Sequence, residues 1–340
     1  MKLLLFNPEH DLALAANLSN FTAPHAGRQL HTDLGYLPAL WATADDYVLV
    51  DDADEAQTAF SRLMHRQFPR FVEKRQLTRF DITSVEPWGW DLALRSFLLR
   101  SGVRPEACAS EAAIADIREL SHRCTAVTLL SQISPLEVPM VCETVGAVEK
   151  ALSRWDKVVI KAPWSSSGRG IRFVERVLDD YQRGWLQNIL ERQGSVVVEP
   201  YYNKVKDFAM EFESDGQGLV TYRGLSLFQT SNGAYTGNIL ASEEEKLTII
   251  SPYASKDSLD TIQQNICRHL GPVFASRYKG PFGVDMMIVA RPDKDGYLLH
   301  PCVEINLRRT MGHVALALQQ EGVMQIVYSD KHYKLKINRK

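Results

Sequence analysis

The chain has 340 residues, which is enough for two or three domains of ordinary size. Hydrophobic residues make up 45% of it, and 39 basic residues against 41 acidic ones give a formal net charge of −2. This balance excludes a global field that would draw the chain to nucleic acid or an anionic membrane. No apolar run approaches the roughly 18 residues that a membrane span needs.

The spacing of the cysteines and the composition of the first ten residues indicate in which cellular compartment the protein occurs. The five cysteines are odd in number and widely spaced, without a CxxC pair, so we expect reduced thiols. The apolar core of MKLLLFNPEH is too short for a signal peptide and no small-residue cleavage site follows it. Together these features predict a cytoplasmic protein.

Residues 1–115 alternate between strand and helix patterns, which predicts an α/β lobe. The apolar runs at 2–6 and 47–50 favour strands, and residues 54–79 resemble one charged, solvated helix. Asp91 is positioned to cap a further helix that ends at Gly102. The polar segment 7–31 follows the first strand, where open α/β sheets bind ligands, although caps and turns would explain its Asp and Asn residues equally well.

The segment VVIKAPWSSSGRGIRFV, residues 158–174, predicts a strand, a loop and a second strand. Lys161 lies near the end of the first strand and brings a positive charge to the loop. Serine hydroxyls, glycine N–H groups and an arginine then follow, and these are donors that suit phosphate oxygens. The sequence therefore predicts a phosphate-binding loop made of Ser165, Ser166, Ser167, Gly168, Arg169 and Gly170. A solvated hairpin with charged residues at its tip is the alternative.

A second hairpin is predicted around the turn signal RPDKDG, residues 291–296. Folding the chain about this turn places Asp285 opposite Glu304, and Asn306 shares the face of Glu304 because it lies two residues further along. Two carboxylates and an amide oxygen are hard ligands of the kind that Mg²⁺ prefers. The trio Asp285, Glu304 and Asn306 is therefore the predicted metal site.

A lysine with a serine- and glycine-rich loop, followed far downstream by Asp285 and a Glu304-x-Asn306 pair on a hairpin, resembles the ATP-grasp superfamily over residues 121 to 320. The resemblance implies an α/β (α+β) fold, in which a Rossmann-like lobe precedes a two-lobed ATP clamp. The implied domains are the pre-ATP-grasp lobe at 1–115, the subdomain with the phosphate loop at 116–200, and the subdomain with the metal site at 201–330.

The resemblance also implies ATP as the nucleotide, with Mg²⁺ or Mn²⁺ beside it. A basic residue at the start of the helix 121–133 would contact the phosphates, and either Arg123 or His122 occupies that position. The adenine would meet the hinge between the two lobes, and an acidic residue just beyond it would hold the ribose. By position, these residues are Glu199, Tyr201, Tyr202 and Asp207.

The reaction that the resemblance implies is a ligation, in which a small carboxylate is phosphorylated by ATP and an amine or similar nucleophile then displaces phosphate. Lys161 would hold the phosphates, and Arg308 would meet the reacting anion if the strand of Asn306 continues that far. Candidate contacts for the second substrate are Glu9, His10, Ser231, Asn232, Tyr235, Thr236 and Asn238. A small-molecule kinase and a non-catalytic nucleotide-binding protein are the alternatives. The expected partners are small molecules, without nucleic acid or membrane, and a homodimer is left open.

Overall fold

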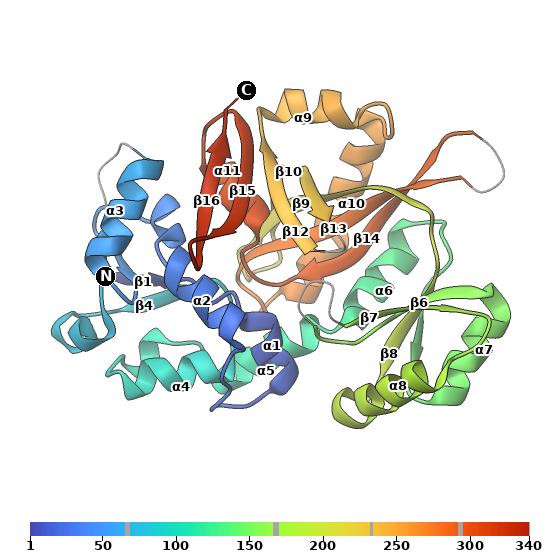
Figure 1. Ribbon diagram of the computed structural model, residues 1–340, viewed down its shortest axis with the longest axis horizontal. Helices are drawn as coiled ribbons and strands as arrows, with labels where there is room; N and C mark the ends of the chain where they lie inside the picture. Colours follow the sequence, from blue (N-terminus) through green and yellow to red (C-terminus); the bar gives the residue numbers. More distant parts are fainter. Residues whose placement is uncertain (65–68, 166–169, 232–233, 292–294, 340) are drawn as a thin grey trace. The chain divides into compact units, whose positions relative to one another are not determined.

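The computed structural model describes residues 1–64, 69–165, 170–231, 234–291 and 295–339 (Figure 1). Contacts between residues divide the chain into two compact units. Unit 1 contains residues 1–118, 236–241 and 307–340, and unit 2 contains residues 119–235 and 242–306. The finer boundaries at 115 and 200 stay predictions.

Unit 1 is built on a parallel sheet of order β3-β2-β1-β4. Its strands are β1 (Lys2–Leu5), β2 (Tyr47–Leu49), β3 (Arg70–Val72) and β4 (Ser84–Pro87). The leucines of β1 are buried in the core of the unit, which explains why so short a strand is stable at the centre of the sheet. The connection from β1 leads to one side of the sheet and β4 lies on its other side, so the carboxyl ends of β1 and β4 form a topological switch point.

The helices of unit 1 follow the strands closely. They are α1 (His10–Ala16), α2 (His25–Leu34), α3 (Ala53–Leu63), α4 (Leu92–Arg100) and α5 (Glu111–Leu120), with 3-10 turns η1 (Leu37–Leu40), η2 (Lys74–Arg79) and η3 (Pro105–Ala107). Asp91 caps α4 as predicted, since its Oδ1 accepts the Leu94 N–H at 2.8 Å.

The expected single helix over residues 54–79 is wrong. The helix α3 ends at Leu63, and Arg70–Val72 pairs in parallel with β2 as a third strand. Pro69 disfavours helix before this strand, and Phe71 and Val72 prefer the pleated conformation.

The C-terminal part of unit 1 contains α11 (Met311–Ala317) and two antiparallel strands, β15 (Gly322–Ser329) and β16 (His332–Asn338). Residues 237–240 of β12 (Ala234–Leu240) pair with β15 on its other side. The strand β16 therefore lies at the edge of this sheet.

Unit 2 contains a first antiparallel sheet of order β5-β8-β6-β7. Its strands are β5 (Met140–Cys142), β6 (Lys157–Lys161), β7 (Ile171–Glu175) and β8 (Val196–Pro200), and α6 (Arg123–Ile133) precedes it. Helices α7 (Val145–Trp155) and α8 (Asp180–Gln193) cover one face, drawn in green in Figure 1, and supply apolar side chains to its core. The predicted cap Thr144 accepts the Ala147 N–H at 3.2 Å.

The second sheet of unit 2 has the order β10-β9-β13-β14. Its strands are β9 (Lys204–Ser214), β10 (Val220–Ser226), β13 (Gly280–Ala290) and β14 (Tyr297–Asn306), and β11 (Phe228–Ser231), α9 (Glu243–Ile250) and α10 (Lys256–Phe274) complete the unit. Residues 201–203 join β8 to β9 and therefore connect the two sheets. Within the described ranges, no helix is long and apolar enough to cross a membrane.

Candidate active site

The predicted hairpin is formed by β13 and β14, and its register is confirmed. Asp285 lies opposite Glu304, and Gly283 lies opposite Asn306. The three predicted metal ligands therefore share one face of the sheet, all of them partly exposed. Asn306 Nδ2 also donates to Asp285 Oδ2 at 3.1 Å, so the amide and one carboxylate are in direct contact. Residues 292–294 of the turn lie outside the described residues.

The donor set at this hairpin fits a magnesium ion. It offers two carboxylates and one amide oxygen on adjacent strands, and Mg²⁺ takes such oxygens together with substrate phosphates. No group of three or more His, Cys, Asp and Glu side chains is positioned for a metal among the residues that the structure describes. A metal at the trio would therefore depend on Asn306 or on substrate oxygens as well as on the carboxylates.

Arg123 connects the hairpin to the predicted phosphate-binding loop. It is the first residue of α6 and is only 7% exposed. Its guanidinium donates to the carbonyl of Ala162 at 2.8 Å and to Ser165 Oγ at 3.3 Å, and pairs with Glu304 Oε1 at 2.9 Å. A planar fork of five donors can hold three such partners at once, which a lysine ammonium at this position could not do with the same geometry.

The base of the loop is tightly packed. A Cβ on Gly170 would come within 2.4 Å of Ser165 Oγ, so only glycine fits beside the serine that Arg123 contacts. Ala162 N–H donates to the Gly170 carbonyl at 2.8 Å and closes the loop. The other predicted members of the loop, Ser166, Ser167, Gly168 and Arg169, lie outside the described residues.

Lys161 and Glu199 form a buried ion pair. They are diagonal neighbours on β6 and β8, their nearest atoms are 2.5 Å apart, and their side chains are only 5% and 6% exposed. Both residues and Arg123 line one small cavity together with Cys302 of β14. The predicted phosphate-binding lysine therefore lies next to the predicted adenine-binding glutamate.

Two polar side chains beside this pair have unsatisfied atoms. His300 of β14 is fully buried, and neither of its ring nitrogens has a hydrogen-bond partner among the described residues. The hydroxyl of Tyr202 is buried and likewise finds none among them. Their rings meet edge to face with centroids 5.4 Å apart. Burial lowers the pKa of His300 to about 4 and raises the pKa of Tyr202 to about 12, so both are neutral at pH 7. Buried groups of this kind normally have partners, so the hinge offers donors and acceptors for a heterocycle or water.

The other hinge residues are more exposed. Tyr201 is 41% exposed, and the ammonium of Lys157 lies 4.1 Å from its ring centroid. Asp207, the predicted ribose contact, pairs with Lys204 at 2.6 Å and accepts from Thr230 at 3.2 Å. Asp207 and Ala209 lie opposite Met287 and Asp285 on β13, which places Asp207 on the same face of the sheet as the metal trio.

Arg308 belongs to unit 1. The condition under which it would share the face of Asn306 is not met, because β14 ends at Asn306. Its guanidinium instead forms a bidentate pair with Asp11, with Nε and Nη2 at 2.9 and 2.7 Å from the two carboxylate oxygens. The neighbouring Arg309 pairs with Glu86 and lies over the ring of Trp41, which indicates a structural role.

The segment after β1 lies at the switch point of the parallel sheet. His10 is buried, and its Nδ1 lies 3.6 Å from Asp91. Asn7 Nδ2 donates to the Gly89 carbonyl at 2.8 Å, which ties the end of β1 to the loop after β4. Glu9 pairs with His31; burial opposes the charged imidazole, but the hydrogen bond and the charge of Glu9 outweigh it, so the pKa of His31 is raised.

The candidate contacts at 231–238 are only partly described. Nothing is described for the side chain of Ser231, and Asn232 lies outside the described residues. Burial, helped by the charge of Glu211, raises the pKa of Tyr235. Asn238 is 1% exposed within its strand and therefore does not form an open wall of a site.

No protein-family model and no curated protein sequence matches the chain. Solved structures do match it. N5-carboxyaminoimidazole synthetase from Staphylococcus aureus, complexed with ADP, is 13% identical with a TM-score of 0.50, covering 97% of this chain and 83% of that one. Biotin carboxylase from Campylobacter jejuni is 12% identical with a TM-score of 0.53, covering 98% and 73%. An ATP-grasp superfamily protein from Archaeoglobus fulgidus is 14% identical with a TM-score of 0.50, covering 100% and 99%. The chain has the ATP-grasp fold.

The ATP-grasp fold confirms the predicted fold class. It does not assign residues, because identities of 12–14% establish the fold alone. Sequence reasoning did not single out His300 or Asp11 as individual site residues. A histidine two residues before Cys302 on an apolar strand carries no motif, and the partner of Arg308 is 297 residues away in the chain.

Proposed function

We propose that the chain is an ATP-dependent ligase that activates a small carboxylate as an acylphosphate and transfers the acyl group to an amine or similar nucleophile. The position of Arg123, between the base of the phosphate-binding loop and Glu304, carries the proposal. Phosphoryl transfer requires positioning and charge neutralisation more than covalent chemistry, and this arginine joins the elements that would supply both.

The nucleotide would lie across the hinge of unit 2. Lys161 would hold phosphate oxygens, and the polar atoms of Tyr202 and His300 would face the base. The ammonium of Lys161 already pairs with Glu199. A bound phosphate would therefore share this ammonium with the carboxylate. Asp207 would accept the ribose hydroxyls in place of its present contact with Thr230.

Asp285, Glu304 and Asn306 would hold Mg²⁺, which when bound neutralises phosphate charge and orients the transferring group. The hairpin of β13 and β14 keeps these three oxygen donors on one face of the sheet. Arg123 holds Glu304 in place from the side of α6.

The second substrate would meet the switch point of the parallel sheet in unit 1, where the partly exposed Glu9 and Arg308 are candidate contacts. His10 is 1% exposed and would not meet the substrate directly. The bidentate pair with Asp11 fixes the guanidinium of Arg308 in one plane, which suits recognition of a planar carboxylate. Two of the similar structures are by name a synthetase and a carboxylase, one with ADP and one with an ATP ligand, and this favours ligation over the kinase alternative.

The test uses ATP labelled at the γ-phosphate, Mg²⁺, and pools of small carboxylic acids and amines. A ligase releases labelled phosphate only when both an acid and a nucleophile are present, and hydroxylamine in place of the amine traps the acylphosphate as a hydroxamate. A kinase yields a labelled product that hydroxylamine does not cleave. A nucleotide-binding protein binds ATP and gives neither product.

A further inference from the structure

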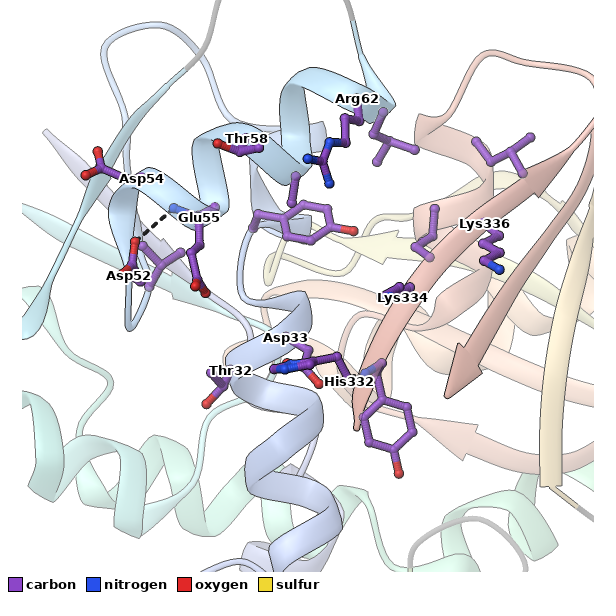
Figure 2. Close-up of a pocket in the computed structure, with 18 of the residues that line it drawn as sticks. Thr32, Asp33, Asp52, Asp54, Glu55, Thr58, Arg62, His332, Lys334 and Lys336 are labelled. Atoms are coloured by element: carbon purple, nitrogen blue, oxygen red, sulfur yellow. Dashed lines mark hydrogen bonds and ion pairs between the residues drawn. The ribbon is translucent and has the colours of Figure 1, made fainter. Parts of the chain in front are cut away.

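Unit 1 contains a cavity of about 920 Å³ that includes none of the predicted site residues (Figure 2). It lies between α3, β16 and the last turn of α2. Its volume is within the range of small-molecule sites, roughly 300–1,000 Å³. Its walls combine apolar side chains with carboxylates and cations, so it differs from a purely apolar packing defect.

The charges of the cavity are separated along α3. Asp52 caps the helix, and Glu55 lies in its first turn, whereas Arg62 lies in its last. Glu55 and Arg62 are seven residues apart and therefore on the same helix face, about 10 Å from one another along the axis. Figure 2 shows Asp52 and Glu55 on one side of the cavity and Lys334 and Lys336 on the strand at the other side.

Between these charges the cavity has an apolar floor. Ala56, Ala59 and Leu63 lie on the face of α3 between Glu55 and Arg62, and the two alanines leave room that larger side chains would fill. Leu335 and Ile337 of β16 form the facing wall. A ligand that fits is therefore elongated, apolar in the middle and oppositely charged at its ends.

The edge of β16 adds hydrogen-bonding groups. Tyr333 N–H donates to Asp33 Oδ2 at 2.7 Å and so is turned away from β15. In an antiparallel pair this direction alternates, which turns the N–H and C=O groups of Leu335 and Ile337 towards the same edge. No other strand of the described ranges pairs there.

The wall that carries this edge is held in place by Asp33. Its carboxylate accepts from Gln29 at 3.0 Å as well as from Tyr333, and pairs with His332 at 2.7 Å. Through these three partners, Asp33 joins the first residues of β16 to α2. The following residues of β16 are thereby positioned beside α3, with which they line the cavity.

We propose that this cavity binds a short extended peptide of two or three residues with free termini. Its ammonium group would face Asp52 and Glu55, its carboxylate would face Arg62 and Lys336, and its backbone would pair with the edge of β16. An extended chain advances about 3.3–3.6 Å per residue, so three residues match the 10 Å between the charges of α3. The proposal does not rest on the proposed ligase activity, since it concerns a different cavity and binding without ATP.

Calorimetry of the full chain with trialanine and trileucine tests the proposal, alongside their N-acetylated and C-amidated forms. We expect the free tripeptides to bind and either blocked form to bind at least about tenfold more weakly, because each block removes one charged contact. Glu55→Gln should weaken the free and amidated peptides but leave the acetylated one unchanged. Lys336→Gln should weaken the free and acetylated peptides but leave the amidated one unchanged.

This crossed pattern distinguishes recognition of the peptide ends from general damage, which would affect every peptide alike. Lys150→Gln on α7 removes an exposed positive charge from unit 2 and should change nothing. The proposal is overturned if free tripeptides do not bind at millimolar concentration, or if both blocked forms bind as tightly as the free one.

Discussion

Lys161 offers the sharpest test, because the structure gives it two roles that can be separated. Its ammonium is proposed to bind phosphate, yet it also neutralises Glu199 inside unit 2. Replacing Lys161 with methionine keeps the volume of the side chain and leaves the Glu199 carboxyl, only 6% exposed, without its cation. Breaking a buried ion pair in this way costs about 3–5 kcal/mol, because the remaining charge loses both water and its partner.

Removing both charges should reverse most of that loss. In the double variant Lys161→Met, Glu199→Leu, no charge is left uncompensated, and apolar replacement of a buried pair is often neutral or stabilising. The free energy of unfolding, measured by urea denaturation, should therefore return to within about 1–2 kcal/mol of the parent value. Arg183→Met breaks the exposed pair with Glu149 and should cost no more than about 1 kcal/mol.

The affinity for ATP should not recover in the double variant as the stability does. Calorimetry with ATP should show weak or absent binding in both the single and the double variant, since neither has the ammonium. The double variant thus has a stable fold but lacks both the proposed phosphate contact of Lys161 and the predicted adenine contact of Glu199. ATP binding at the parent affinity in the double variant would refute the phosphate role and leave Lys161 a structural residue.

Three further predictions concern other parts of the site. Glu304→Gln should abolish ATP turnover with the fold intact, whereas Glu191→Gln on the surface of α8 should be silent. Arg308→Lys breaks a bidentate pair, so the Michaelis constant for the acid should rise about tenfold while that for ATP stays near its parent value; the exposed Arg104→Lys is the control. Because burial lowers the pKa of His300 to about 4 from 6.5, the unfolded chain binds the extra proton between these values and stability falls as the pH decreases. His300→Phe should remove about 2 kcal/mol of that decrease at pH 5, measured by denaturation against the parent.

Local patterns were sufficient where one chain segment determined the geometry. The pairing of Asp285 with Glu304 follows from a turn signal and the period of a strand, and the caps Asp91 and Thr144 follow from their own side chains. The strand Arg70–Val72 was missed because three residues between charged segments show no periodicity. Its stability comes from pairing with β2, which lies more than 20 residues earlier.

The partners of the charged residues could not be predicted for the same reason. Nothing near Arg123 in the sequence indicates Glu304, and nothing near Arg308 indicates Asp11. Such ion pairs form only when sheets and helices pack against each other. The sequence therefore predicts which residue types the chemistry needs, but not which residues these side chains contact before substrate binds. For the same reason, the sequence leaves open whether the strand of Asn306 continues to Arg308: β14 ends at Asn306, and Arg308 pairs with Asp11.

These pairs have a consequence for how the ligands would bind. Lys161, Arg123 and Lys204 each already contact a carboxylate that is itself a predicted ligand contact. Phosphates would therefore meet cations that already hold a carboxylate, and they would share these cations with it. Glu304 would contribute to the metal site while Arg123 orients its carboxylate from α6, and the same guanidinium lies beside the base of the phosphate-binding loop. We expect Mg²⁺ and ATP to strengthen each other's binding, because Arg123 contacts both a predicted metal ligand, Glu304, and the base of the predicted phosphate-binding loop at Ser165.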